Sequence, residues 1–243
     1  DLPYESTDER VVTVVNTGSS SDTYYSKFIA TDGTSGPGYW QETVKPGITT
    51  SLDSSTLPHQ LYNIDRDVFV FRKTTWTDRL VGDTVTNESP SFVGEKIQQA
   101  FLHNNRLGIL TEDNVVLSQS NDLFNFYYTT ALTSTDADPI DISCSSIRPA
   151  LLHGIVATAQ GLVLFSKNQQ FLLFAEEGSI TPSTAIIRSI SNYEVDANID
   201  PIDVGTNINF VSKTGSYSRV FGMQTRGYDE NPIVQDISKT VSD

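Results

Sequence analysis

The densest group of residues that could do chemistry is the acidic stretch TSTDADPIDIS, which contains Asp136, Asp138 and Asp141. Three carboxylates could hold calcium, but the stretch lacks the glycine-centred, glutamate-terminated loop of an EF-hand. Two carboxylates that flank a sugar could also hydrolyse a glycosidic bond. Because Asp and Pro commonly form turns ahead of strands, we interpret the stretch as an acidic turn.

The histidines and the single cysteine show no spacing typical of a catalytic or metal site. His59, His103 and His153 lie in LPHQL, FLHNN and LLHGI, and no HxH or HExxH spacing directs two imidazoles to one metal. The signatures GxSxG and GxGxxG and the phosphate-binding loop are absent as well. We therefore expect structural histidines, a small apolar core residue at Cys144, no cofactor, no metal and no enzyme activity.

Aromatic residues and the net charge bear on binding. Tyr39 and Trp40 in GPGYWQE could stack on a sugar, although a tryptophan in a β module more often belongs to the core. Lys and Arg number 16 and Asp and Glu 30, so the formal charge is −14. This charge argues against a surface that grips nucleic acid, which needs clustered cations. The longest apolar runs, at 68–71 and 171–175, are too short to span a bilayer, so we expect no membrane insertion by this segment.

Strands must hold these side chains. Short runs rich in Val, Ile, Thr, Tyr and Phe alternate with Gly, Asn, Asp and Ser clusters, which predicts an all-β protein. The first strands are expected in residues 10–17, 23–31, 38–47, 59–64 and 67–76. A long irregular stretch, GDTVTNESPSFVG, follows Arg79. We therefore divide the chain into a small antiparallel β module at 1–78 and a second part at 79–243.

Three later segments share one layout of apolar strand, polar turn and apolar strand, at 106–120, 161–177 and 207–223. Their turns supply the Asn, Asp or Gly that a hairpin needs. They recur every 45 to 55 residues or so, a period typical of propeller blades, and this favours β-propeller-like blades over an ordinary meander. Segment 94–104 is compatible with either a helix or a strand.

Several motifs in fixed order resemble the tail tubular protein B family, the nozzle proteins of short-tailed bacteriophages (podoviruses). They extend from about Gly38 to about Phe210 and are LPHQL (57–61), GD (82–83), TNESPSFVG (86–94), NRLGIL (105–110), NVVLSQSNDLFNFY (114–127), TDADPID (135–141) and LVLFSKNQQFLL (162–173). The family's proteins are longer, and a chain that begins at Asp1 is expected to be a piece of such a protein.

The resemblance implies a virion structural protein without catalysed chemistry. Six copies would form a ring below the portal and adaptor, on a platform that contains a β-propeller, and the lumen would conduct the genome. The implied partners are further copies of the chain in a homohexamer, the tail adaptor (tail tubular protein A), the tail fibres and viral DNA that passes without specific binding. The implied location is the phage tail, with host cytoplasm as the place of assembly.

The residues singled out are structural. In the hairpin at 106–120, Leu107, Ile109, Leu110 and 115–117 are expected to fill a sheet core. Aromatic residues follow this hairpin and are expected to cover an adjoining blade or subunit, namely Phe124, Phe126, Tyr127 and Tyr128.

Charged and turn-forming residues complete this set. Arg106 is placed to pair with a nearby carboxylate such as Asp122. Gly94 and Gly108 permit turns or close approach of neighbouring chain, and Pro90 and Pro139 are expected at the entry to strands.

Two other functions compete with the nozzle. A carbohydrate-binding or glycan-degrading tail protein predicts an open pocket with two carboxylates beside a Trp or Tyr platform. A generic propeller scaffold predicts a monomer without a ring, and fold alone does not separate these functions.

Overall fold

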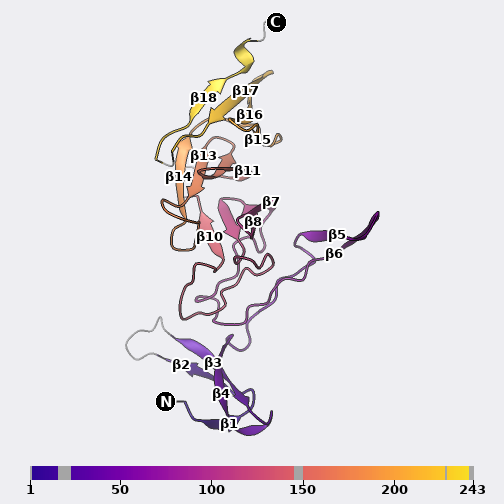
Figure 1. Ribbon diagram of the computed structural model, residues 1–243, viewed down its shortest axis with the longest axis vertical. Helices are drawn as coiled ribbons and strands as arrows, with labels where there is room; N and C mark the ends of the chain where they lie inside the picture. The colour runs from indigo at the N-terminus through magenta and orange to yellow at the C-terminus, as the bar shows by residue number, and fades with distance from the viewer. Residues whose placement is uncertain (1, 16–22, 145–149, 228, 241–243) are drawn as a thin grey trace. The chain divides into compact units, whose positions relative to one another are not determined.

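A computed structural model describes residues 2–15, 23–144, 150–227 and 229–240, and they form an all-β protein of small antiparallel sheets (Figure 1). The chain divides into two compact units. The first unit comprises residues 1–89 and 124–138, and the second unit comprises residues 90–123 and 139–243. Among the described residues, no helix has the length and apolar character needed to cross a membrane.

The N-terminal sheet belongs to the first unit and has the strand order β1-β4-β3-β2. Its strands are β1 (Glu5–Thr7), β2 (Val11–Val14), β3 (Tyr24–Ala30) and β4 (Ser35–Thr43). Phe28 on β3 is fully buried, and the Trp40 ring meets it edge-on at a centroid distance of 5.1 Å. The Trp40 indole also donates to the Pro3 carbonyl at 2.9 Å. Trp40 is therefore a packing residue of this sheet, as expected.

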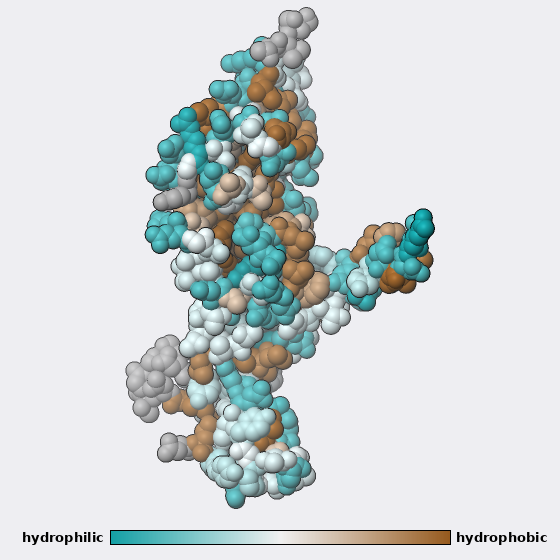
Figure 2. All heavy atoms as spheres, viewed as in Figure 1, coloured by the Kyte–Doolittle hydropathy of each residue, from teal (hydrophilic) through white to brown (hydrophobic). Residues whose placement is uncertain are grey.

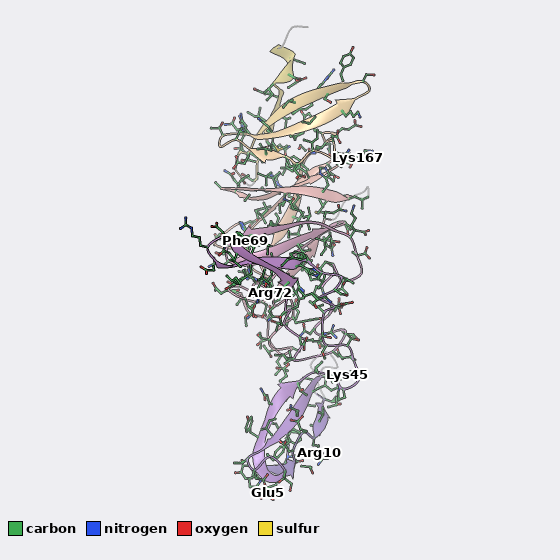
Figure 3. All side chains as sticks on the ribbon, turned by 90° about the vertical axis from the view of Figure 1, so that its right-hand side faces the viewer. Glu5, Arg10, Lys45, Phe69, Arg72 and Lys167 are labelled. Atoms are coloured by element: carbon green, nitrogen blue, oxygen red, sulfur yellow. The ribbon has the colours of Figure 1, made fainter. Side chains whose placement is uncertain are left out.

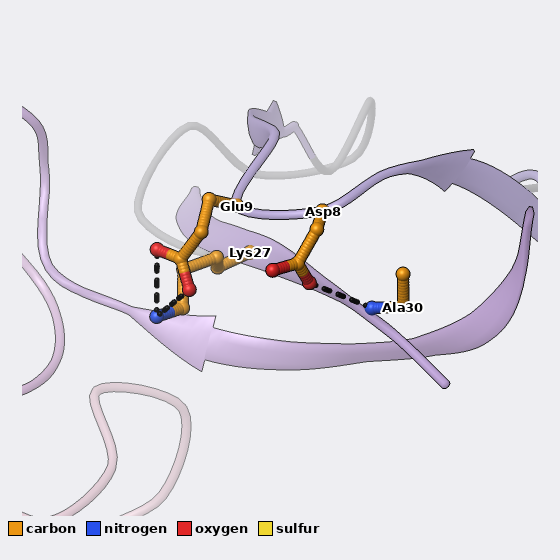
Figure 4. A network of polar contacts seen from close by, with 4 residues as sticks. All are labelled: Asp8, Glu9, Lys27 and Ala30. Atoms are coloured by element: carbon orange, nitrogen blue, oxygen red, sulfur yellow. Dashed lines mark hydrogen bonds and ion pairs between the residues drawn. The ribbon is translucent and has the colours of Figure 1, made fainter. Parts of the chain in front are cut away.

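The turn between β1 and β2 is fixed by two acidic residues (Figure 4). Asp8 accepts a hydrogen bond from the Ala30 backbone N–H at 2.8 Å, and Glu9 forms an ion pair with Lys27 at 3.0 Å. Glu9 has a positive φ of 61°, which an L residue rarely adopts. The Asp8 side chain thus accepts the hydrogen bond of a β3 backbone N–H in the turn between β1 and β2.

A two-stranded hairpin follows in the first unit. It consists of β5 (His59–Asp65) and β6 (Val68–Lys73) and has a bulge between Asn63 and Asp65. Phe69 and Arg72 lie on this hairpin in Figure 3. The expected strand at 67–76 ends at Lys73, three residues early, because Thr74 and Trp76 turn into the core of the first unit.

The second unit contains three four-stranded antiparallel sheets, each built from strands in chain order. The first sheet is β7 (Ile97–His103), β8 (Arg106–Thr111), β9 (Asn114–Leu117) and β10 (Ile140–Ser143). The second is β11 (Leu152–Thr158), β12 (Gly161–Ser166), β13 (Gln170–Phe174) and β14 (Ile186–Ser191). The third is β15 (Ile202–Asp203), β16 (Ile208–Thr214), β17 (Tyr217–Gln224) and β18 (Ile233–Asp236), followed by a short 3-10 helix, η2 (Ser238–Thr240).

The middle sheet is buried on both faces. Successive side chains of a strand point to opposite faces of a sheet, so each of its strands contributes to two cores. On β12, Leu162 and Leu164 join a core with residues of the first sheet, including Leu110, Val115 and Leu117. Val163 and Phe165 point the other way and share a second core with residues of the third sheet, including Ile208, Phe210 and Met223. The three sheets therefore stack in chain order through two continuous apolar cores.

The structure confirms the three predicted hairpins as β8–β9, β12–β13 and β16–β17. It also decides the open choice at 94–104 in favour of strand β7. An Asn104–Asn105 turn with φ of 46° and 59° connects β7 to β8, and such positive φ values suit a tight two-residue hairpin turn. Pro139 directly precedes β10, but Pro90 begins a turn and leads into no strand, so that expectation was wrong.

The two units do not follow the predicted division at residue 79. Residues 79–89 pack with the N-terminal part, and the chain returns to the first unit at 124–138 after forming β7, β8 and β9. The all-β class is confirmed. Within the described residues the sheets do not close into a ring, so propeller-like blades stay a proposal.

Candidate functional site

The predicted aromatic cluster lies on segment 124–138, and its anchor in the first unit is the buried side chain of Trp76. Phe124 meets the Trp76 ring edge-on at 5.7 Å, and Phe126 packs against it at 5.8 Å. The Thr77 backbone N–H donates to the Phe124 carbonyl at 3.0 Å. Segment 124–138 is thus held by both ring packing and the main chain.

Arg79 forms the second attachment and is almost completely buried. Its guanidinium donates to the Ser89 hydroxyl at 2.8 Å and to the Thr49 carbonyl at 3.3 Å. The same group lies over the Tyr127 ring, 4.9 Å from its centroid. A planar guanidinium can stack and donate at the same time, which a lysine ammonium does less well.

Asn87 forms the third attachment through its amide. The buried side chain donates to the carbonyls of Val81 and Tyr128, both at 3.1 Å, and accepts from the Tyr128 backbone N–H at 2.9 Å. The Asn87 amide therefore both donates to and accepts from the Tyr128 backbone, as the backbone of a neighbouring strand would. A buried amide with its partners satisfied fixes one arrangement of the chain.

Glu42 on β4 forms the fourth attachment. Its carboxylate accepts from the Thr130 hydroxyl and from the Ala131 backbone N–H, each at 2.7 Å. Hydrogen bonds to a charged acceptor are stronger than neutral ones. Trp76, Arg79, Asn87 and Glu42, which we call the anchor, together bind the segment from Phe124 to Ala131.

The residues that the sequence offered as candidates for catalysis or metal binding do not come together in one site. Asp141 accepts from the backbone and hydroxyl of Ser91 at 2.8 and 2.7 Å, whereas Asp138 accepts from the Thr135 backbone at 2.7 Å. No group of three His, Cys, Asp or Glu side chains in the described parts of the chain could hold a metal. Burial raises the pKa of the Cys144 thiol to about 12, and this residue belongs to the core between the first two sheets of the second unit. It is a packing residue, as expected.

A comparison with protein families decides what kind of protein carries this architecture. The family model described as bacteriophage nozzle protein matches residues 1–243. The chain belongs to the bacteriophage nozzle protein family.

A curated protein extends this result. Tail tubular protein gp12 of Escherichia phage T7 is 31% identical to the chain over 220 residues, which are 90% of this chain and 27% of the T7 protein. The chain thus spans 27% of the length of that relative. The predicted resemblance is confirmed, and a member of the nozzle family is a structural protein of the phage tail.

Two of the motifs that resemble the family contribute to the anchor or its surroundings. In GD and TNESPSFVG, Asp83 accepts from the backbone N–H groups of Val85 and Thr86, Asn87 holds Tyr128, and Ser89 accepts from Arg79. Sequence reasoning had missed Trp76, Arg79, Asn87 and Glu42. Of these four residues only Asn87 lies in one of the two motifs, and a polar residue does not reveal a partner 41 to 89 positions away.

The predicted aromatic residues divide by exposure. Phe126 and Tyr127 are buried inside the first unit, so for these two the expectation that they cover another blade or subunit was wrong. Tyr128 remains 36% exposed. Its part in a subunit contact stays a prediction.

The other predicted residues lie in the second unit. Arg106 is buried and donates to the Ser118 carbonyl at 2.7 Å, while its pairing with Asp122 stays a prediction. Gly94 ends a turn with a φ of 88°, a backbone conformation that favours glycine. Gly108 on β8 leaves space for the Phe101 ring, because a Cβ at this position would overlap that ring. These glycines thus serve a turn and a close approach, respectively.

Replacing Arg79 with alanine is expected to lower the free energy of unfolding by about 2–3 kcal/mol, because two hydrogen bonds and the stacking on Tyr127 are lost. Urea unfolding, followed by tryptophan fluorescence, measures this change. Arg226→Ala removes an exposed 3.7 Å pair with Glu230 and should cost less than about 0.5 kcal/mol. Equal losses in the two variants would contradict the role of Arg79.

Acid pH is expected to destabilise the protein in two steps. Burial lowers the pKa of His103 and His153 from the ordinary 6.5, so the unfolded chain binds protons first and stability falls as pH drops below 6.5. Hydrogen bonds from the backbone of Thr86 and Val85 lower the pKa of Asp83 from the ordinary 3.8, so its contribution is present above 3.8 and is lost below it.

Unfolding midpoints between pH 8 and pH 3 test both steps. His153→Gln should reduce the first loss, and Asp83→Asn should reduce the second. A pH profile that neither variant changes would contradict the assignment.

Proposed function

We propose that the chain is part of a ring-shaped conduit in the phage tail nozzle, through which the genome leaves the virion, and that it catalyses no reaction. The observation that carries the proposal is the family match over residues 1–243. The anchor fits a structural role, because its four members contact rings, a hydroxyl group and backbone of the chain itself.

The three stacked sheets of the second unit would be successive blades of a β-propeller. Propeller blades are four-stranded sheets that bury both faces against their neighbours, as the middle sheet does here through Leu164 and Phe165. Propellers commonly have about four to eight blades, so at least one further blade would complete the ring of sheets.

The formal charge of −14 suits a conduit. Contacts between cationic side chains and phosphates bind DNA tightly and without regard to sequence, so an acidic wall favours sliding. DNA would be a passing partner without a binding site.

The proposed partners follow the same assignment. They are five further copies in a homohexamer, the tail adaptor, and the tail fibres, with assembly in the host cytoplasm and residence in the virion. The tail tubular protein of phage T7 is the relative that supports membership of a tail assembly. Tyr128 is the exposed member of the aromatic cluster that could reach a subunit contact.

Light scattering and electron microscopy of the full-length protein, with and without the adaptor ring, test the proposal. We expect six-fold rings on the adaptor. A protein that stays monomeric in both conditions and binds a glycan array would overturn it in favour of a carbohydrate-binding tail protein.

A further inference from the structure

The β5–β6 hairpin is not covered by the rest of the first unit. It is a two-stranded sheet, and no other strand among the described residues pairs with it. Every residue from Leu61 to Lys73 is exposed. An isolated two-stranded hairpin is marginally stable in water, and its outer backbone groups are free to pair with another chain.

One face of the hairpin is strongly apolar. The register places Leu61 opposite Phe71 and Asn63 opposite Phe69, so these side chains share a face. Leu61 is 68% exposed, Phe69 59% and Phe71 71%. In Figure 2 the hairpin carries brown hydrophobic residues among hydrophilic ones and ends in a hydrophilic tip. We call Leu61, Phe69 and Phe71 the hairpin patch.

The opposite face is partly covered by the hairpin itself. The Arg72 guanidinium lies over the Tyr62 ring, 4.7 Å from its centroid, and Arg72 also donates to Gln60 at 3.3 Å. On the patch side, the His59 ring stacks on the Phe71 ring with a centroid distance of 5.2 Å, and Phe71 remains 71% exposed. Tyr62 and Val70 on the opposite face are still 51% and 38% exposed, which is less than any side chain of the hairpin patch. The hairpin patch is therefore the face with the more exposed apolar side chains.

Charge indicates which partner fits. The hairpin segment 59–73 contains three basic and two acidic residues and carries +1. The rest of the chain contains 13 basic and 28 acidic residues and carries −15. A cationic apolar arm on an otherwise strongly acidic chain is complementary to another copy of the same chain.

We infer that the hairpin patch binds a second copy of this chain and is a subunit contact of the assembled ring. This inference rests on the proposed ring. Burial of the three apolar side chains would supply the apolar centre of the contact, and the positive charge of the arm would meet the acidic surface of the neighbour.

The double variant Leu61→Ser/Phe71→Ser in the full-length protein tests the inference. We expect the concentration at which half of the protein is assembled to rise about 10-fold or more, measured by sedimentation velocity. The matched control is Leu102→Ser/Tyr217→Ser, which replaces side chains that are 68% and 79% exposed on other strands. The control should assemble like the wild type.

The outcomes separate the inference from the proposed function. If the wild type forms rings and the hairpin variant assembles equally well, the inference is overturned and the ring stands. If the wild type forms no oligomer, both fail. If the control dissociates as much as the hairpin variant, the effect is general loss of apolar surface and the inference fails.

A photo-crosslinking amino acid in place of Phe69 gives a second readout that does not depend on stability. Products of twice the chain mass are expected from purified protein. Crosslinks confined to one chain, or binding to vesicles of anionic phospholipid that the double variant abolishes, would assign the patch to another role.

Discussion

Replacement of Phe126 with alanine is expected to lower the free energy of unfolding by about 3–5 kcal/mol. The Phe126 ring is buried and packs at 5.8 Å from Trp76, so its removal leaves a cavity beside an equally buried indole. The segment around Phe126 has no strand ladder to hold it, so the ring accounts for much of its attachment.

Guanidinium unfolding with tryptophan fluorescence measures this effect, because Trp76 is itself the neighbour of the replaced ring. Tyr128→Ala is the matched control on the same segment. Tyr128 is attached through its backbone to Asn87, and this attachment survives the substitution, so a loss below about 1 kcal/mol is expected. A Phe126→Ala protein with the wild-type midpoint would refute the anchor.

Replacement of Phe171 with alanine should be about as costly in the second unit, again roughly 3–5 kcal/mol. Phe171 lies on β13, is fully buried, and belongs to the core shared by the first two sheets. Phe171→Leu keeps most of the volume and should cost less than about 1.5 kcal/mol. Tyr217→Ala, at an exposed position, is the surface control.

Hydrogen exchange distinguishes a shared core from two separate ones. If the core is shared, Phe171→Ala should speed amide exchange in β8 and β9 as well as in β12, because one cavity weakens both sheets. Faster exchange confined to β11–β14 would contradict the stacking on which the proposed blades depend.

The local sequence determined the all-β class and the three hairpins, because strand alternation and turn residues act over a few positions. The pattern at 161–177, with Leu and Val on alternating faces ahead of the turn SKNQ, predicted the β12–β13 hairpin that the structure shows. The fixed order of motifs also determined the family, which the match over residues 1–243 confirms.

The tertiary structure decided where segment 124–138 belongs. The aromatic residues from Phe124 to Tyr128 were visible in the sequence, but their partner Trp76 lies about 50 positions earlier, and the Glu42 carboxylate reaches Thr130 across 88 positions. Hydrophobicity predicts that an aromatic ring is buried, but it does not predict which surface the ring packs against. Similarly, Gly108 was marked as special by its type alone, and only the fold shows that the Phe101 ring occupies the space above it.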